Sequence, residues 1–302
     1  MVRSGKARPH VGRNRGAPPR ITFGQVAGEV LVMVGVLLLL FAFYEAFWTN
    51  LKSGQLQEKA GEGLAESWNR ATGNPRKVIQ PELGDAFAWL RTPAFGADYQ
   101  YAVVEGTGEE ALLAGPGRYP QTQMPGEPGN FALAGHRVGK GAPFNDLGAL
   151  QACDELTVET REATFTYRVL PLGEDEATRR GEAAACLSPE QVERVVAGDY
   201  AAVTGRLITT PDDVAVIEPL PGAPGAAGVS ELAGPADTGP AHLDPSGPSQ
   251  RSGHADLGQL SGLEGMITLT TCHPQFSNAE RMVIHGMLVS VAPKENVAAA
   301  HG

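Results

Sequence analysis

Cys272 is the residue of this sequence with the clearest potential for chemistry. It ends the β-rich run ITLTTC (residues 267–272) and is followed by His273 and Pro274. A side chain at the end of a strand lies at the rim of a sheet, where binding and catalytic groups concentrate. Four roles are open for this thiol: a small buried apolar side chain, a disulfide partner, a metal ligand or a nucleophile.

A cysteine nucleophile needs a basic or cationic neighbour, because the neutral thiol reacts slowly. Of the seven histidines, His136 is the best candidate, since it directly follows the apolar, strand-like segment FALAG (131–135). His285 alternates with apolar residues inside a strand, which favours a structural role. Arg281 begins the next β-rich run and is permanently charged. Taken singly, each of these residues also fits an ordinary structural position.

The three cysteines, Cys153, Cys186 and Cys272, leave at least one thiol unpaired within the chain, and three pairings are open. A zinc site of Cys272, His273 and His285 would lack a fourth ligand and any usual spacing. We therefore expect neither a metal nor another cofactor.

Charge divides the chain into a basic head and an acidic remainder. Residues 1–28 hold six Arg or Lys and no acidic residue, which leaves 18 basic and 34 acidic side chains elsewhere. The acidic part is not expected to bind nucleic acid, because a polyanion needs a positive field.

The head is followed by 23 mostly apolar residues, 26–48, which are long enough to cross a hydrocarbon core of about 30 Å. With the positive-inside rule, this predicts a cytoplasmic head (1–25), a single-pass anchor in the cell membrane (26–48) and an extracellular remainder. A cleaved signal peptide is the alternative, but bulky aromatic residues stand where small ones should mark cleavage.

The extracellular part begins with a polar juxtamembrane stalk, residues 49–84. From residue 85, short apolar runs alternate with Gly/Pro turns, which favours a β-barrel or sandwich. Eight runs are expected strands: 99–104, 131–135, 155–160, 164–169, 202–209, 214–219, 266–272 and 281–291. Short helices are expected at 109–115, 145–151 and 188–198.

Two segments interrupt the β pattern. Residues 171–199 are acidic and helix-containing, whereas residues 221–262 are rich in Gly, Pro, Ala and Ser. The second segment buries too little apolar surface to offset its chain entropy, so we expect a disordered loop. Residues 293–302 form a C-terminal tail.

Together these residues resemble the sortase family. Its TLxTC signature appears as TLTTC at 268–272, and TLTTCHP followed by Arg281 is similar to the class E sortases of high-GC Gram-positive bacteria. The segment 103–150, with its PGEPGN turn and AGHR at 134–137, resembles the upstream half of the family. The similarity covers roughly residues 85–170 and 200–292.

The resemblance implies a mainly β fold, an eight-stranded sortase-type barrel (85–292) with short helices, preceded by one transmembrane helix. It implies a monomeric cysteine transpeptidase that cleaves a C-terminal sorting signal of secreted proteins between Thr and Gly and joins the protein to a cell-wall amine. Cys272 would attack the Thr carbonyl, His136 would transfer protons, and Arg281 would hold the substrate or the oxyanion.

The resemblance has further implications, which rest on fewer residues. Class E implies an LAxTG-like rather than an LPxTG signal, and Tyr119 and Thr271 are candidates for substrate or oxyanion contacts. Cys153 stands where the family often has a glycine and Cys186 lies in the segment 171–199, an insertion relative to the family. We expect these two cysteines to pair and to pin the insertion to the barrel. A Cys–His protease with water as acceptor, or a non-catalytic module that binds wall proteins, remains as an alternative.

Overall fold

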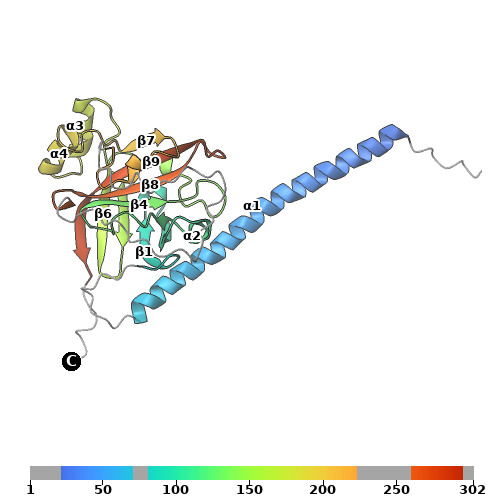
Figure 1. The fold of residues 1–302 in the computed structure, drawn as a ribbon, viewed down its shortest axis with the longest axis horizontal. Coiled ribbons are helices and arrows are strands. Elements are labelled where there is room, and N and C mark those ends of the chain that lie inside the picture. Colours follow the sequence, from blue (N-terminus) through green and yellow to red (C-terminus); the bar gives the residue numbers. More distant parts are fainter. Residues whose placement is uncertain (1–21, 71–80, 223–259, 295–302) are drawn as a thin grey trace, which may run out of the picture. The chain divides into compact units, whose positions relative to one another are not determined.

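A computed structural model of the chain describes residues 22–70, 81–222 and 260–294 (Figure 1). It divides into two compact units, residues 1–47 and 48–302. Most of the predicted basic head, most of the Gly/Pro-rich loop and nearly all of the predicted tail lie outside the described residues.

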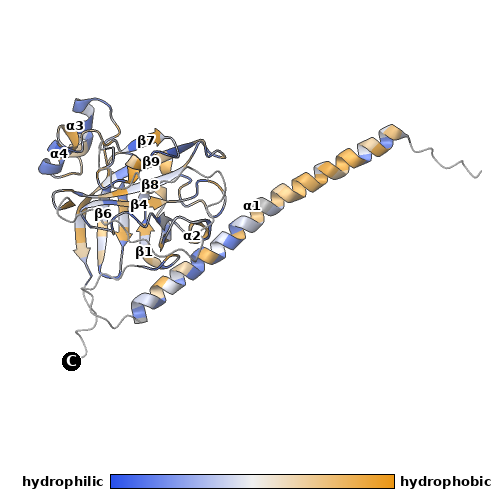
Figure 2. Ribbon diagram, in the orientation of Figure 1, coloured by the Kyte–Doolittle hydropathy of each residue, from blue (hydrophilic) through white to orange (hydrophobic). Residues whose placement is uncertain are grey.

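Helix α1 (Phe23–Arg70) contains the predicted anchor. Among the described residues, it is the one helix long and apolar enough to cross a membrane. Its first part is apolar and its last part mixes polar and apolar residues (Figure 2). The predicted stalk therefore begins as a continuation of the same helix.

The strands of the second unit form a closed barrel. They are β1 (Ala86–Arg91), β2 (Gln100–Glu105), β3 (Gly117–Arg118), β4 (Gly129–Ala134), β5 (Glu155–Glu159), β6 (Ala163–Val169), β7 (Arg206–Thr209), β8 (Gly265–His273) and β9 (Glu280–Pro293). Hydrogen bonding follows the order β6-β5-β1-β2-β3-β4-β8-β9, and β6 pairs again with β9, so eight strands close on themselves. The predicted mainly β barrel is confirmed.

The length of β9 explains how the ring closes. Its 14 residues pair with β8 along one edge. Along the other edge its first part pairs with β7 and its second part, from Gly286 onward, pairs with β6. The pairs β2–β3 and β4–β8 are parallel, and the remaining pairs are antiparallel.

Alternation along the strands separates a barrel interior from an outer face. Phe131 and Leu133 of β4, Leu269 of β8 and Ile284 of β9 are buried in the main apolar core. Each such side chain contributes about 1.5–3 kcal/mol to folding. The residues between them point to the other side of the sheet, which we call the outer face.

Short helices connect the strands: α2 (Glu109–Ala114), α3 (Glu176–Ala184) and α4 (Pro189–Val196), with the 3-10 turns η1 (Pro93–Phe95), η2 (Leu147–Ala149) and η3 (Val214–Ile217). The strand expected at 214–219 is wrong, because η3 occupies this segment. Its valines and isoleucine favour a strand, but Asp213 accepts a hydrogen bond from the Ala215 N–H at 3.2 Å and starts a turn instead. Strands β1 and β3 were not predicted, and the helix expected at 145–151 is only the turn η2.

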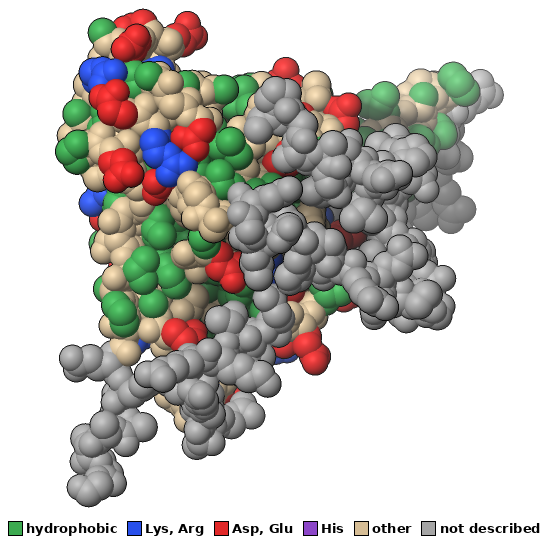
Figure 3. All heavy atoms as spheres, turned by 60° about the vertical axis from the view of Figure 1, so that its left-hand side comes forward, with side chains coloured by type: hydrophobic (Ala, Val, Ile, Leu, Met, Phe, Trp, Pro, Cys, Tyr) green, Lys and Arg blue, Asp and Glu red, His purple; other side chains and the backbone are tan. Residues whose placement is uncertain are grey.

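The predicted insertion is a helical pair that packs on the barrel in a second apolar core, which includes Met266 of β8 and Met287 of β9. Ser188 caps α4 in a reciprocal capping box with Gln191. The buried Arg179 of α3 donates to the carbonyls of Val195 and Val203 at 2.8 and 3.1 Å. On the face drawn in Figure 3, acidic and basic side chains lie beside one another.

A disulfide joins Cys153 to Cys186, with the Cα atoms 5.7 Å apart. It links the residues just before β5 to the turn between α3 and α4. The insertion is therefore covalently tied to the barrel, as expected from the sequence.

Candidate active site

Parallel pairing of β4 with β8 brings His136 and Cys272 to one rim of the barrel. The register places Ala134 opposite Thr270, and the Gly135 N–H donates to the Thr270 carbonyl at 3.0 Å. His136 follows Ala134 by two residues, as Cys272 follows Thr270. Because the two strands run in the same direction, both side chains reach the same rim and the same face.

Arg281 joins them from the opposite side of β8. In the antiparallel pair β8–β9, Cys272 and Arg281 are direct cross-strand partners. Side chains of such partners project from the same face of a sheet. Cys272 and Arg281 thus lie on the adjacent strands β8 and β9, and His136 lies two residues past the end of β4, which is β8's other neighbour (Figure 1).

The outer face below them is lined by small and β-branched residues. The residues that alternate with the interior residues of these strands are Ala132, Thr268, Thr270 and Val283. Val216 and Ile217 of η3 pack against Ala132 and Val283, and Tyr119 borders this cluster. This floor below Cys272 is therefore buried, and η3 covers its apolar part.

Tyr119 contributes a hydroxyl to this floor, 2.9 Å from the Thr270 Oγ1. Burial raises the pKa of Tyr119, and Cys272 adds to this, whereas the Thr270 hydrogen bond and the positive charge of Arg281 lower it. Tyr119 therefore lies within electrostatic range of both Cys272 and Arg281. The structure brings this candidate to the site.

Thr271 is placed differently. It is 3% exposed, and its hydroxyl donates to the Gly135 carbonyl at 2.8 Å. Its side chain points away from the face that carries Cys272 and fastens the end of β8 to the end of β4. A direct side-chain contact of Thr271 with substrate stays a prediction that this geometry does not favour.

His136 has an unusual environment for a half-buried imidazole. Its Nε2 is buried and has no hydrogen-bond partner among the described residues. Burial lowers the pKa of His136, the nearby ammonium of Lys140 lowers it further, and the carboxylate of Glu109 opposes this. The resting imidazole is thus biased toward its neutral form, with a nitrogen free to exchange a proton.

Cys272 is the free cysteine of the chain and is partly exposed. Arg281 is also partly exposed, and its Nη1 donates to the carbonyls of Asn278 and Glu280 at 3.1 and 3.0 Å. These two hydrogen bonds use one nitrogen of the guanidinium fork. They hold the side chain at the start of β9, whose residue 281 is the cross-strand partner of Cys272.

Arg137 belongs to the site but was not predicted from the sequence. Its Nη1 lies 2.6 Å from the Nδ1 of His273 and 3.4 Å from the carbonyl oxygen of Cys272. The guanidinium can only donate, so the Nδ1 of His273 is the acceptor and carries no proton. Arg137 therefore ties the loop after β4 to the end of β8. Its place in the AGHR segment, directly after His136, was the available signal.

A buried polar cluster lies on the outer face, next to the segment that contains η3. The Asn130 amide donates to the carbonyls of Val216 and Glu218 at 3.3 and 3.0 Å, so its Oδ1 must face Thr268. The Thr268 hydroxyl donates to this oxygen at 2.7 Å and can then only accept from the Nδ1 of His285, 2.9 Å away. The cluster joins β4, β8, β9 and the end of η3.

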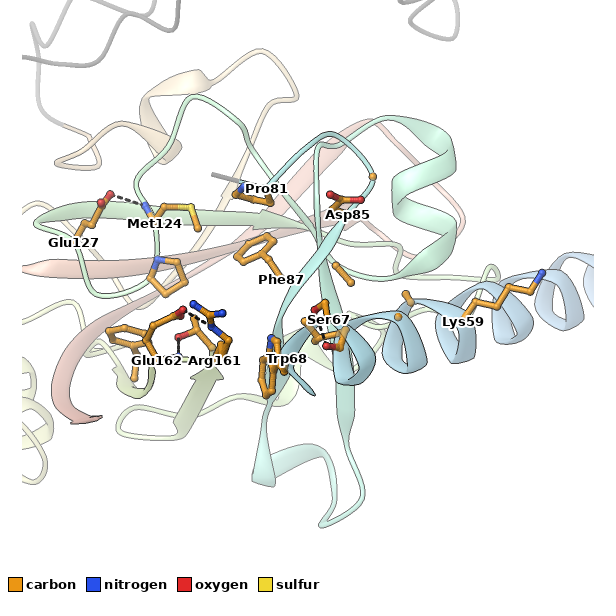
Figure 4. A pocket seen from close by; sticks show the side chains of 18 residues that line it. Lys59, Ser67, Trp68, Pro81, Asp85, Phe87, Met124, Glu127, Arg161 and Glu162 are labelled. Carbon is orange, nitrogen blue, oxygen red and sulfur yellow. Dashed lines mark hydrogen bonds and ion pairs between the residues drawn. The ribbon is translucent and has the colours of Figure 1, made fainter. Parts of the chain in front are cut away.

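A cavity of about 590 Å³ lies elsewhere (Figure 4). Phe87, Met124 and Arg161 are among its lining residues, together with Leu64 and Trp68 of α1. The turn before β6 that lines it pairs with the end of β9, whereas Cys272 pairs with the start of β9. The cavity is thus remote from the candidate site. The described residues contain no group of three or more His, Cys, Asp or Glu that could hold a metal ion.

The chain is similar to known proteins over most of its length. A family model described as a sortase domain matches residues 90–289. The SrtF sortase from Corynebacterium diphtheriae has a similar structure, with a TM-score of 0.61 and 48% identity, covering 76% of this chain and 98% of that chain.

Two relatives from Streptomyces coelicolor are more distant. Sortase SrtE1 is 26% identical over 281 residues, which are 91% of this chain and 59% of the relative. Sortase SrtE2 is 31% identical over 176 residues, 53% of this chain and 68% of the relative. The chain thus spans about three fifths of the length of the first and two thirds of the second. The matched domain includes all three residues at the rim, and the chain belongs to the sortase family.

Proposed function

We propose that this protein is a membrane-anchored class E sortase. It would cleave an LAxTG-like or LPxTG-like C-terminal sorting signal between Thr and Gly and join the protein to a cell-wall amine. The observation that carries this proposal is that Cys272 and Arg281 are cross-strand partners on β8 and β9, while parallel pairing of β4 with β8 brings His136 to the same rim. Relatives named SrtE1 and SrtE2 support the class.

The residues divide the reaction into two acyl transfers. In the first, the Cys272 proton passes to the unpaired Nε2 of His136, and the sulfur attacks the Thr carbonyl carbon. The tetrahedral oxyanion forms beside the fixed guanidinium of Arg281. When the C–N bond breaks, His136 returns the proton to the leaving Gly nitrogen and a thioester remains.

In the second transfer the roles reverse. The incoming amine attacks the thioester carbonyl, and His136 accepts the proton that the amine nitrogen loses. The new amide forms and the Cys272 sulfur leaves. An imidazole with a lowered pKa suits this exchange, because it releases its proton readily to the leaving amine.

The outer face is the proposed groove for the sorting signal. An extended peptide would lie at the rim, where Ala134 and Tyr119 are partly exposed beside Cys272, because Ala132, Thr268 and Val283 are buried. The Tyr119 side chain would contact the peptide there. In the proposed topology the basic head is cytoplasmic and the barrel is extracellular.

The test uses the full-length protein in nanodiscs with LAxTG and LPxTG peptides, each with and without glycine or a diamino-acid. Mass spectrometry of the products should show the Thr–amine adduct with added amine, and LAxTG should turn over faster than LPxTG. Cleavage that is indifferent to added amine would favour a protease with water as acceptor. No cleavage by a folded protein would favour a binding module.

A further inference from the structure

One face of the second part of α1 packs against the barrel. Ser53, Gly61 and Leu64 are buried, whereas their neighbours along the helix are mostly exposed. Their spacing places them on one side of a helix. A Cβ at Gly61 would lie 2.6 Å from the ring of Trp89 in β1, and Leu64 is 1% exposed. These contacts lie within the compact unit 48–302.

Ser53 is the polar member of this buried row. Its Oγ lies 2.7 Å from the carbonyl oxygens of both Leu113 and Lys140, and Ser53 is 0% exposed. A hydroxyl has a single proton, so the two carbonyls share it. The Gln57 Nε2 donates to the same oxygen at 3.3 Å. Ser53 thus joins α1 to helix α2 and to the loop that contains Lys140.

Gly141 shows how closely the helix approaches one of these loops. Its φ of +77° is a conformation that side-chain-bearing residues rarely adopt. A Cβ there would lie 2.2 Å from the Nε2 of Gln57 and 3.0 Å from the Oγ of Ser53. The Gly141 N–H donates to the Oδ1 of Asn50 at 3.4 Å. We call residues 50–57 the clasp segment, because their side chains hold the backbone of residues 140 and 141.

The loop held by the clasp segment is the one that follows His136. Its far end returns to the histidine, since the Phe144 N–H donates to the His136 carbonyl at 3.0 Å. The ring of Phe144 covers Gly135, where a Cβ would lie 2.5 Å from it. The side chain of Lys140 forms an ion pair with Glu109 at 3.2 Å, and both charges act on the pKa of His136. The clasp segment therefore reaches the candidate acid–base through one short loop.

We propose that the clasp segment of α1 is a positioning element of the active site. By holding Lys140 and Gly141, it fixes the loop that sets the place and the charge environment of His136. Docking of this helix on the barrel is then required for full turnover. The inference rests on the proposed role of His136, but the holding of the loop can be measured without any activity.

The test compares Ser53→Ala with Ser67→Ala in the full-length protein in nanodiscs. Ser67 lies on the same helix, and its hydroxyl donates to the helix's own Leu64 carbonyl at 2.7 Å, so it is a control on the same helix. Ser53→Ala should lower kcat for peptide transfer about 3- to 10-fold with KM changed less than about twofold, because geometry and not binding is affected. Amide hydrogen exchange should accelerate at residues 138–144 and not in the barrel strands.

A milder variant, Asn50→Ala, removes an exposed side chain and should change the same two readouts to a smaller extent. The proposal is overturned if Ser53→Ala matches Ser67→Ala in kcat. It is equally overturned if exchange accelerates across the whole barrel, which would indicate a general loss of stability. Failure of the proposed function would appear separately, as full activity of His136→Ala, whatever the exchange of the loop.

Discussion

Acid should destabilise this fold through His285. The side chain is 2% exposed and lies in the buried polar cluster of the outer face. Burial lowers its pKa to about 4, against a small opposing effect of the Asp213 carboxylate. An ordinary histidine has a pKa of about 6.5. Between these two pKa values, His285 is therefore mostly protonated in the unfolded chain and mostly neutral in the folded chain.

The size of the effect follows from this difference. Above pH 6.5 the imidazole is neutral in both states, so it does not change the free energy of unfolding with pH. Between pH 6.5 and 4 the unfolded state gains a proton that the folded state does not, so the free energy of unfolding falls. At pH 4 the loss amounts to about 3 kcal/mol, and below that pH it grows little because both states are protonated.

The assay is urea unfolding of the full-length protein in detergent micelles, followed by tryptophan fluorescence from pH 7.5 to pH 4. The comparison is with His285→Gln, which keeps a donor for Thr268 but cannot be charged. Carboxylates titrate in both proteins, so only the difference in pH dependence counts. With an m-value of about 2 kcal/mol/M, the wild-type midpoint should fall by about 1.5 M urea more than that of the variant. Urea midpoints that fall equally with pH in the wild type and in His285→Gln would refute the reasoning.

Three further predictions concern the site and the insertion. Lys140→Gln should raise the pKa of His136, because it removes a positive charge that disfavours the imidazolium; an NMR titration of the imidazole measures this. Replacing Cys153 and Cys186 by alanine should lower the free energy of unfolding by about 3–4 kcal/mol, the chain-entropy value for a separation of 33 residues, as measured in urea. Arg137→Gln should lower kcat about tenfold with little change in KM, because the end of β8 loses its tie to β4; steady-state kinetics measures both.

Each of these has an outcome that would contradict it. A histidine titration unchanged by Lys140→Gln would show that the ammonium is too far away or too well solvated. Equal urea midpoints for the oxidised protein and the double alanine variant would mean that the disulfide constrains nothing. A rise in KM at constant kcat in the Arg137 variant would indicate a role in substrate binding instead.

The rim of the barrel was predictable because it follows from local order in the chain. FALAG and ITLTTC are apolar runs that end at His136 and Cys272, and a strand end marks a sheet rim whatever the topology. Their side-by-side arrangement was not visible, since nothing local says that β4 and β8 pair in parallel across more than 130 residues. The family resemblance supplied that long-range information.

Other features depend on tertiary contacts that residue types do not encode. The segment 214–219 has strand-forming residues, but the cap by Asp213 and packing on the outer face make it a 3-10 turn. Strand β3 has two residues and no sequence pattern of its own. Ser53 looks like any polar residue of a stalk, and only its burial against the carbonyls of Leu113 and Lys140 distinguishes it.

The most direct test of the account is to identify the covalent intermediate. The full-length protein is incubated with an LAxTG peptide without an amine, quenched in acid, digested and examined by mass spectrometry. The account predicts a peptide ending in Thr, joined as a thioester to Cys272, which hydroxylamine releases and which Cys272→Ala cannot form. An adduct on another residue, or wild-type cleavage by Cys272→Ala, would contradict it.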